Sequence, residues 1–188
     1  MPGDLLSRLL VHLEEKGERS CVIISGGIGA GKTRISEQLA AALKERGFSV
    51  GGILSPRIIQ DGETVGYTVC DLASGMQRPF ARLERPGLAV GRFFIAEEGL
   101  AVARSAIERA AATAQVVFVD EVGRLEVAGG GLAPAVRVLL RSKALPVLLV
   151  RSSFVDAVVR TFSIARFEVL QAERGALPSV GEGGLPDG

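Results

Sequence analysis

A glycine-rich turn that joins a short apolar run to a helical pattern constrains the fold more than any other feature. The run CVIIS at residues 21–25 is rich in β-branched side chains and free of charge, which is typical of a strand buried on both faces. Four glycines follow within the next six positions, and from residue 32 apolar side chains recur at helical spacing. A strand that passes through a tight turn into a helix begins a β-α-β unit, so we expect a parallel sheet with helices on both faces.

Residues 26–33 read GGIGAGKT and match the template Gly-x-x-x-x-Gly-Lys-Thr of phosphate-binding loops at every fixed position. Because glycine has no Cβ, such a loop can curl so that successive main-chain N–H groups point at one anion, and the following helix adds the positive end of its dipole. Lys32 is expected to reach the β- and γ-phosphates, and the Thr33 hydroxyl to ligate Mg²⁺. The alternative is a flexible glycine turn without a ligand, but a chance match in a chain this long is a roughly one-in-a-hundred event. The residues expected to contact a bound nucleotide are Gly26, Gly27, Ile28, Gly29, Ala30, Gly31, Lys32, Thr33, Arg34 and Arg151.

A second run, VVFVDEVGRLE at residues 116–126, places two acidic residues at the end of a buried strand. Enzymes with such a loop use an acid at this place to hold Mg²⁺, and Asp120 fits it. Glu121 points to the other side of the strand end, where a carboxylate can orient or deprotonate the water that attacks the γ-phosphate. The alternative is that both acids merely mark the polar end of a strand. We therefore predict Thr33 and Asp120 as metal ligands, and Lys32 and Glu121 as catalytic residues.

Arginine side chains can add positive charge beside a transferring phosphoryl group. Arg57, Arg124 and Arg151 stand at expected loop edges. Arg151 directly follows the apolar run VLLV, so it is expected at the carboxyl edge of the sheet, where ligands bind in open α/β folds. Most of the eighteen arginines are expected to be solvated surface charge, and Arg151 alone of these three enters the expected nucleotide site.

The rest of the chain alternates between helical and strand patterns. Between residues 55 and 81, short β-like runs separated by DG and ASG turns predict a small antiparallel excursion. The chain is therefore expected to be an α/β protein with three αβα layers and a mostly parallel central sheet. Residues 1–176 are expected to form one domain, followed by a disordered Gly- and Pro-rich tail at 177–188. Helices are expected at 4–16, 32–46, 96–114, 132–143 and 154–162, and strands at 21–25, 48–54, 116–119, 145–150 and 166–170.

Composition and charge exclude several classes of protein. The 22 basic and 21 acidic residues leave a net charge of +1, so no general attraction to nucleic acid or to a membrane is expected. No apolar run approaches the roughly 20 residues of a spanning helix, and the amino end lacks the features of a signal peptide. Cys21 and Cys70 are expected to be buried, inert thiols in a reducing cytosol. We therefore expect a cytoplasmic protein, in which the only histidine, His12, is structural or solvated.

Taken together, these stretches resemble the small P-loop nucleoside-triphosphatases of thermophilic prokaryotes and, as the cancer-related nucleoside-triphosphatase, of animals. The resemblance spans roughly residues 20–176. It is carried by GGIGAGKT, by GGILSPR…VGYTVCDLASG, by VDEVGRLE and by QAERGALP. It implies a RecA-like α/β core and slow Mg²⁺-dependent hydrolysis of ATP, GTP and other nucleoside triphosphates to the diphosphate. By position it implies phosphate binding by residues 26–33, magnesium held by Asp120, and action on water by Glu121.

Two other functions fit parts of the pattern. A nucleotide-dependent kinase needs an acceptor pocket and a lid with several arginines, for which RPFARLERPG at residues 78–87 has a similar composition. A nucleotide-gated adapter, similar to the molybdenum-cofactor accessory GTPases, would bind a partner. No Asn/Thr-Lys-x-Asp motif for reading guanine is present, and the strand at 145–150 leads into VRSSF instead, so weak base selectivity is expected. The sequence leaves the oligomeric state open.

Overall fold

The computed structural model describes residues 2–14 and 20–172. The last two residues of the helix predicted at 4–16 lie outside the described residues. The same holds for the end of the predicted domain at 173–176 and for the predicted tail at 177–188.

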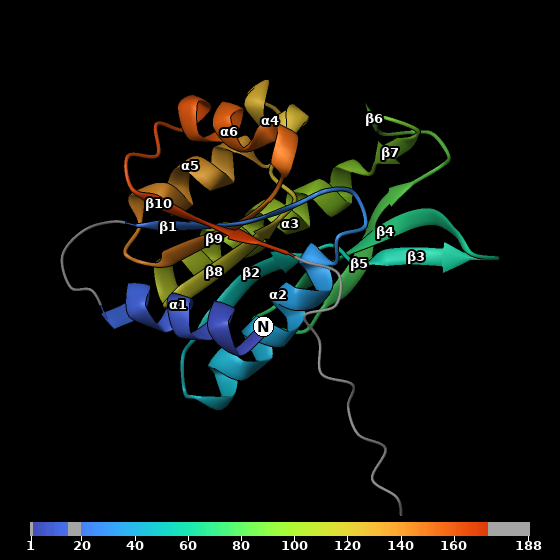
Figure 1. Cartoon of the computed structure of the whole chain (residues 1–188). Coiled ribbons are helices and arrows are strands. Elements are labelled where there is room, and N and C mark those ends of the chain that lie inside the picture. Colours follow the sequence, from blue (N-terminus) through green and yellow to red (C-terminus); the bar gives the residue numbers. More distant parts are fainter. Residues whose placement is uncertain (1, 15–19, 173–188) are drawn as a thin grey trace, which may run out of the picture.

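Five neighbouring strands are parallel and make up the part of the sheet that the helices cover, as predicted (Figure 1). Their order is β10-β1-β9-β8-β2, and every neighbouring pair among them is parallel. One strand, β9, therefore separates the strand before the glycine loop from the strand that ends in Asp120, which is the RecA-like arrangement expected of the core. The five strands are β1 (Cys21–Gly26), β2 (Val50–Leu54), β8 (Val116–Asp120), β9 (Leu145–Arg151) and β10 (Phe167–Gln171).

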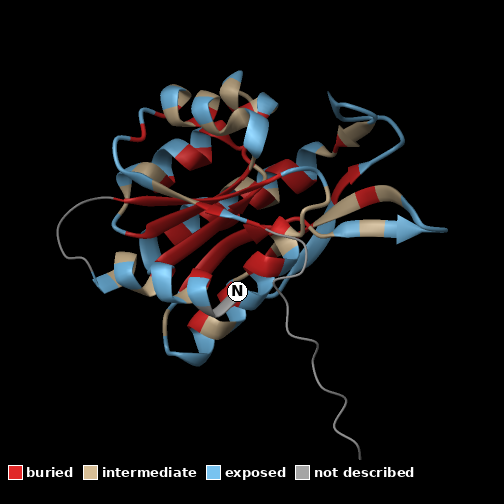
Figure 2. Ribbon diagram, viewed as in Figure 1, coloured by how far each residue is buried: buried red, intermediate tan, exposed pale blue. Residues whose placement is uncertain are grey.

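Helices cover both faces of this sheet, which confirms the three-layer αβα prediction (Figures 1 and 2). Val22 and Ile24 of β1 join the apolar cluster beneath α1 (Pro2–Glu14) and α2 (Lys32–Glu45). Cys21 and Ile23, which point the other way, join the opposite cluster. No helix within the described ranges is long and apolar enough to span a membrane. On the face of the sheet opposite α1 and α2 lie α3 (Glu97–Thr113), α4 (Arg124–Val127), α5 (Ala133–Arg141) and α6 (Val155–Thr161), and the 3-10 helix η1 (Ser152–Phe154) precedes α6.

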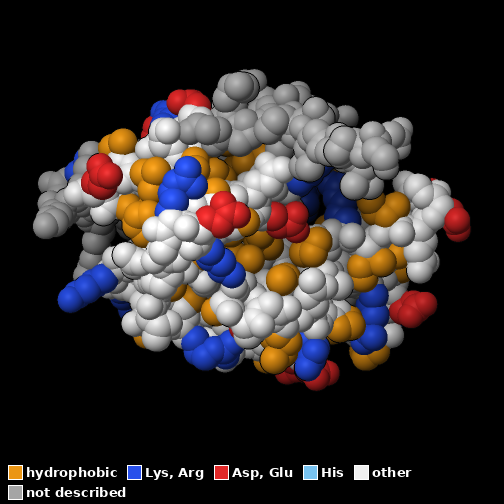
Figure 3. Space-filling model, turned by 90° about the horizontal axis from the view of Figure 1, so that it is seen from below, with side chains coloured by type: hydrophobic (Ala, Val, Ile, Leu, Met, Phe, Trp, Pro, Cys, Tyr) orange, Lys and Arg blue, Asp and Glu red, His pale blue; other side chains and the backbone are white. Residues whose placement is uncertain are grey.

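The amino-terminal helix α1 is docked on the sheet by apolar and by charged contacts. Leu5 and Leu9 are buried in the cluster beneath α1 and α2. His12 Nε2 lies 2.6 Å from Glu168 Oε2 on β10, and Arg8 pairs with the same carboxylate. The outer surface of this side carries charged side chains scattered among hydrophobic ones (Figure 3). His12 is therefore structural, as predicted, because it holds α1 to the edge strand.

The strand predicted at 48–54 begins at Val50 instead, because the two residues before it follow the end of α2. Gly47 has a φ of +85° and donates its N–H to Lys44 O, and the Phe48 N–H is donated to Leu43 O. These two bonds form a Schellman motif, which satisfies carbonyl groups that the helix leaves unpaired. Phe48 thus belongs to the helix cap rather than to the strand.

An antiparallel extension continues the sheet beyond β2, in the order β2-β4-β5-β7-β6, with β3 paired to β4. Asp61 and Gly62 join β3 to β4 with φ values of +50° and +79°, the pattern of a two-residue type I′ hairpin turn. The extension was predicted to end at residue 81 but runs on through two three-residue strands, which are too short to show a periodic pattern. Its strands are β3 (Arg57–Gln60), β4 (Glu63–Asp71), β5 (Gln77–Arg82), β6 (Leu88–Val90) and β7 (Phe93–Ile95).

The two cysteines differ in exposure, so the prediction of two buried thiols is wrong for one of them. Cys21 is buried, and burial raises its pKa to about 12. Cys70, at the end of β4, is only partly buried because the extension leaves this part of β4 accessible. Burial and the neighbouring Asp71 carboxylate still raise the pKa of Cys70, so both thiols remain protonated at neutral pH.

Candidate active site

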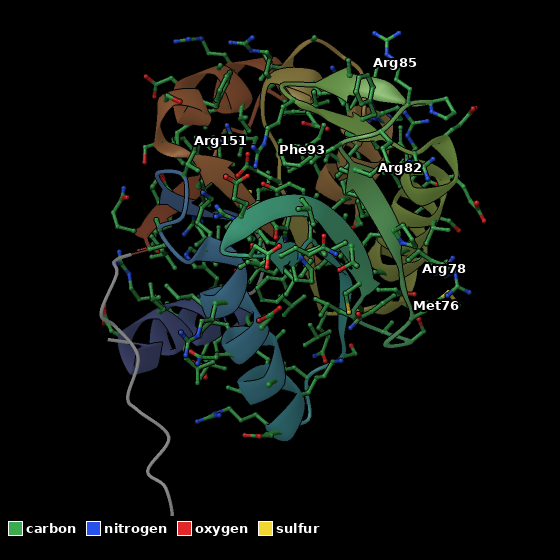
Figure 4. All side chains as sticks on the ribbon, turned by 90° about the vertical axis from the view of Figure 1, so that its right-hand side faces the viewer. Met76, Arg78, Arg82, Arg85, Phe93 and Arg151 are labelled. Carbon is green, nitrogen blue, oxygen red and sulfur yellow. The ribbon has the colours of Figure 1, made fainter. Side chains whose placement is uncertain are left out.

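The carboxyl ends of β1, β9 and β8 meet at one edge of the sheet, which Figure 4 shows face on with Arg151 labelled. The register pairs Gly26 with Arg151 and Asp120 with Leu149. The Ser25 hydroxyl donates to the Ser152 hydroxyl at 3.3 Å, which ties the ends of β1 and β9 together. The pairing of the strands thus brings the glycine loop, the acid-tipped strand and the predicted arginine together.

The glycine loop has the curled backbone that its composition predicts. Gly29 and Gly31 have φ values of +74° and +89°, a region that side chains disfavour, and α2 begins immediately after Gly31. A Cβ on Gly26 would lie 2.9 Å from the Ala30 Cβ and 3.3 Å from a main-chain oxygen of Ala172. Ile28 is exposed at the tip of the loop, so its side chain leaves the inside of the curl open.

Lys32 is buried at the first position of α2 and bends back over the loop. Its Nζ donates to Gly26 O at 3.0 Å and to Gly27 O at 3.1 Å. The same Nζ lies 3.6 Å from Glu121 Oε2. The ammonium group therefore stands between the loop and the predicted catalytic carboxylate, held by neutral carbonyl groups and one ion pair.

The two predicted metal ligands touch each other. The Thr33 hydroxyl donates to Asp120 Oδ2 at 2.7 Å, and the main-chain N–H of Ser55 donates to the same oxygen at 3.0 Å. The Ser55 hydroxyl also donates to the main-chain oxygen of Asp120 at 2.8 Å. Burial raises the pKa of Asp120 to about 6, against the hydrogen bonds from Thr33 and Ser55, which act to lower it.

Ser55 was not predicted as a site residue. It follows directly after β2, which pairs with β8 with Ile53 opposite Val119, so its position beside Asp120 follows from this pairing. A polar residue at the end of a buried strand was the only signal in the sequence, and it needed the strand order to become meaningful.

Glu121 is the partner of two cations. Its Oε1 lies 2.7 Å from Arg151 Nε, and its Oε2 faces Lys32. The carboxylate is about 30% exposed, so water can reach it. Of the three arginines considered from the sequence, Arg151 is the one that contacts this carboxylate. Arg57 and Arg124 are exposed at the starts of β3 and α4, and Arg34 is exposed on the first turn of α2.

The sequence predictions missed a second glutamate, Glu126, which fixes the segment after Glu121. The carboxylate of Glu126 is buried and accepts the N–H of Gly123 at 2.9 Å and the N–H of Leu132 at 3.1 Å. Burial raises the pKa of Glu126, and these hydrogen bonds act against the rise. A Cβ on Gly131 would come within 2.3 Å of this carboxylate, so the glycine at this position makes room for it.

Two further observations concern the metal site and the stretch that the kinase alternative would use as a lid. In the described part of the chain, no group of three or more His, Cys, Asp or Glu side chains is placed to hold a metal ion. The predicted ligands Thr33 and Asp120 bring two side-chain oxygen atoms together, an arrangement that would suit a cation shared with a substrate. The arginine-rich stretch 78–87 forms β5 and the bend that follows it, as part of the extension.

Comparison with known proteins identifies the family. The sequence profile of the family described as NTPase matches residues 21–180. The nucleoside-triphosphatase THEP1 of Methanopyrus kandleri is 37% identical over 116 residues, which span 62% of this chain and 64% of that protein, a little under two thirds of its length. The nucleoside-triphosphatase THEP1 of Methanosarcina barkeri is 31% identical over 163 residues, which span 84% of this chain and 92% of that protein.

Two solved structures share the fold. The solution structure of a human cancer-related nucleoside triphosphatase has a TM-score of 0.62 and 22% identity, over 82% of this chain and 88% of its own. The crystal structure of THEP1 from the hyperthermophile Aquifex aeolicus has a TM-score of 0.65 and 17% identity, over 82% of this chain and 90% of its own. These two structures confirm the predicted fold class. The expected family of nucleoside-triphosphatases is confirmed by the profile match and by the relatives. The chain belongs to the NTPase family of P-loop nucleoside-triphosphatases.

Proposed function

We propose that the protein hydrolyses nucleoside triphosphates, ATP and GTP among them, to the diphosphate and phosphate, with Mg²⁺ as cofactor and weak base selectivity. The observation that supports this most is the convergence of Lys32, Thr33, Asp120 and Glu121 at one edge of the sheet. Thr33 contacts Asp120 at 2.7 Å, and Lys32 faces Glu121 at 3.6 Å. These four side chains supply a cation for the phosphates, two oxygen ligands for a metal, and a base.

Phosphate binding is assigned to the glycine loop and Lys32. The loop N–H groups and the amino end of α2 provide positive partial charge without needing to move. Lys32 Nζ is held by two neutral carbonyl oxygens, which are weaker partners than a phosphate oxygen. An entering triphosphate can therefore accept a hydrogen bond from Lys32, and the loop loses only two weaker hydrogen bonds.

The oxygen atoms of Thr33 and Asp120 fit Mg²⁺, which prefers hard oxygen ligands and, in nucleotide sites, takes one or two from the protein. They lie side by side at the mouth of the loop, where a cation can contact both the protein and the phosphates. When bound, Mg²⁺ neutralises negative charge on the β- and γ-phosphate oxygens.

Glu121 is assigned as the base that accepts a proton from the attacking water. The water oxygen forms a bond to the γ-phosphorus, the bond to the diphosphate oxygen breaks, and the proton passes to Glu121. Arg151, 2.7 Å from the carboxylate, holds it in one orientation, and its guanidinium lies near the charge that develops on the phosphoryl group.

The proposal is tested with the purified full-length protein, Mg²⁺ and each of ATP, GTP, CTP and UTP, by measuring phosphate release with and without candidate acceptors. We expect release without an acceptor, at rates within about tenfold of one another, because no guanine-reading motif is present. Lys32→Ala should abolish most nucleotide binding and turnover, whereas the exposed Lys143→Ala should change neither. Turnover only with an acceptor would mean a kinase, and tight binding without turnover would mean an adapter; either result overturns the proposal.

A further inference from the structure

The end of the sheet extension is more basic than the rest of the molecule. Residues 76–95, here called the basic extension, contain Arg78, Arg82, Arg85 and Arg92 but a single acidic residue, Glu84. This leaves three positive charges in excess, whereas the whole chain carries a net charge of +1. All four arginines are exposed. The segment includes the arginine-rich stretch that a kinase lid would have explained, and the proposed hydrolysis gives it no role.

The same segment exposes apolar side chains. Met76, Leu83, Leu88 and Val90 are 46%, 44%, 44% and 38% exposed, and they make up four of the nine large hydrophobic residues exposed among the described residues. Such residues are ordinary when scattered singly, but a group of them beside positive charge marks an interaction site. Figure 4 shows Arg85, Arg82, Arg78 and Met76 following one another along one margin of the molecule.

Two of the arginines are held in place by aromatic rings. The Arg85 guanidinium lies 5.3 Å from the centre of the Phe94 ring, and the Arg92 guanidinium lies 5.1 Å from the centre of the Phe93 ring. Arg92 also donates to the Thr64 carbonyl oxygen at 2.6 Å. These contacts order the cations before any partner arrives and occupy one face of each ring. The Phe93 ring also contacts the Tyr67 ring edge to face, with the two ring centres 5.2 Å apart.

The outermost strand, β6, ends the sheet. It pairs with β7 from Leu88 opposite Ile95 to Val90 opposite Phe93, and no further strand pairs with it in the described part of the chain. All three residues of β6 are exposed. An edge of this kind offers main-chain N–H and C=O groups to an added strand.

We propose that the basic extension binds an extended acidic polypeptide segment, which adds to β6 as a further strand. Main-chain hydrogen bonds to β6 would supply affinity, and apolar side chains would pack on Leu88 and Val90. Carboxylates would pair with Arg85, which lies over Phe94 of β7, and Arg82, on β5 further into the sheet, would add longer-range attraction. A single-stranded nucleic acid fits less well, because base stacking needs open aromatic faces and an arginine already occupies a face of each phenylalanine ring. This surface is independent of the proposed hydrolysis.

The test uses a fluorescent, end-capped nine-residue peptide of alternating Val and Glu, with the Val/Lys peptide as the charge-reversed probe. We expect the Val/Glu peptide to bind with an affinity that falls as salt rises, the Val/Lys peptide to bind at least tenfold more weakly, and N-methylation of alternate Val/Glu residues to abolish binding. Hydrogen exchange should show added protection at residues 88–90. Arg82→Glu with Arg85→Glu should weaken binding at least tenfold, whereas the control Arg46→Glu with Arg141→Glu should not.

The charge-reversed variant must retain phosphate release at the wild-type rate, because neither arginine belongs to the nucleotide site. Undiminished peptide binding by that variant, or equal binding of the two probes, overturns the proposal. Tighter binding of an oligo-dT strand or of anionic phosphatidylserine vesicles than of the Val/Glu peptide, abolished by the same variant, would assign the surface to nucleic acid or to lipid and overturn it as well. Self-association through β6, seen as concentration-dependent dimers by light scattering, would also overturn it.

Discussion

The substitution Glu121→Gln keeps the size and shape of the side chain and removes its negative charge. Glutamine cannot accept the proton that the attacking water must lose, although its amide oxygen can still accept a hydrogen bond. The change also removes the ion pairs with Arg151 at 2.7 Å and with Lys32 at 3.6 Å. The substitution therefore affects both the rate of catalysis and the stability of the fold. The experiment can be interpreted if the effect on the rate is much larger than the effect on stability.

The effect on catalysis should be far larger than the effect on stability. A positioned general base contributes on the order of 10²- to 10⁴-fold in rate, or about 3 to 5 kcal/mol in the barrier. Glu121 is about 30% exposed and Arg151 about 43%, so solvent screens their pairing, which is worth at most about 1 kcal/mol. The variant should therefore fold normally, bind nucleotide with unchanged or slightly higher affinity, and hydrolyse it at least a hundredfold more slowly.

Single-turnover phosphate release measures the chemical step, and equilibrium dialysis with Mg²⁺ measures nucleotide affinity. The matched control is Glu45→Gln, an exposed glutamate in the last turn of α2, which should leave both quantities unchanged. A release rate within threefold of the wild type would remove Glu121 from the mechanism. A loss of affinity without a loss of the single-turnover rate would make it a binding residue instead.

Three further predictions concern the fold. Gly52→Ala should lower the free energy of unfolding by at least about 2 kcal/mol in urea titrations, because Gly52 has a φ of +88° and a Cβ there would lie 2.0 Å from a backbone oxygen; Gly27→Ala, whose Cβ meets nothing within 4 Å, should lower it by less than about 0.5 kcal/mol. Leu9→Ala should cost about 2–4 kcal/mol, and Val11→Ala on the exposed side of α1 under about 0.5 kcal/mol. Burial acts to raise the pKa of Asp71, but hydrogen bonds and an arginine outweigh this effect and hold the pKa below 3.8. The ionised carboxylate therefore stabilises the folded state above that pH, and this stabilisation is lost as the pH falls through the lowered pKa. Urea titrations should show that Asp71→Asn lowers the free energy of unfolding at pH 7 and loses this effect toward pH 3.

The periodic elements of the fold could be predicted from the sequence, and the short ones could not. All five parallel strands and the helices at 32–46, 96–114, 132–143 and 154–162 were expected, because the strands are short apolar runs and the helices have an apolar period. The four residues of α4 and the three-residue strands β6 and β7 have no period to detect. α4 is held by the buried carboxylate of Glu126, which accepts the N–H groups of Gly123 and Leu132, and β6 and β7 are held by pairing with each other.

The residues of the candidate site also include some that the sequence predicts and some that it does not. Lys32, Thr33, Asp120 and Glu121 stand in sequence patterns whose spacing reflects one chemical task, so motif reasoning brings them together. Ser55 has no such pattern, and its role depends on which strand lies beside β8. The hydrogen bond from the Ser55 N–H to the Asp120 carboxylate can be inferred only when the neighbouring strands are known.

The order of the strands also sets the distance between the glycine loop after β1 and the acidic residues at the end of β8. Neighbouring strands lie about 4.8 Å apart, so the insertion of β9 separates the ends of β1 and β8 by roughly 10 Å. Across that width Lys32 Nζ lies 3.0 Å from Gly26 O and 3.6 Å from Glu121 Oε2, so the lysine bridges the loop and the carboxylate. The insertion of β9 also places Arg151, at the end of this strand, between the two, where its guanidinium pairs with the carboxylate that Lys32 reaches only at 3.6 Å. We therefore expect an entering phosphate to replace the 3.6 Å ion pair of Lys32 with Glu121, while Arg151 keeps the carboxylate paired.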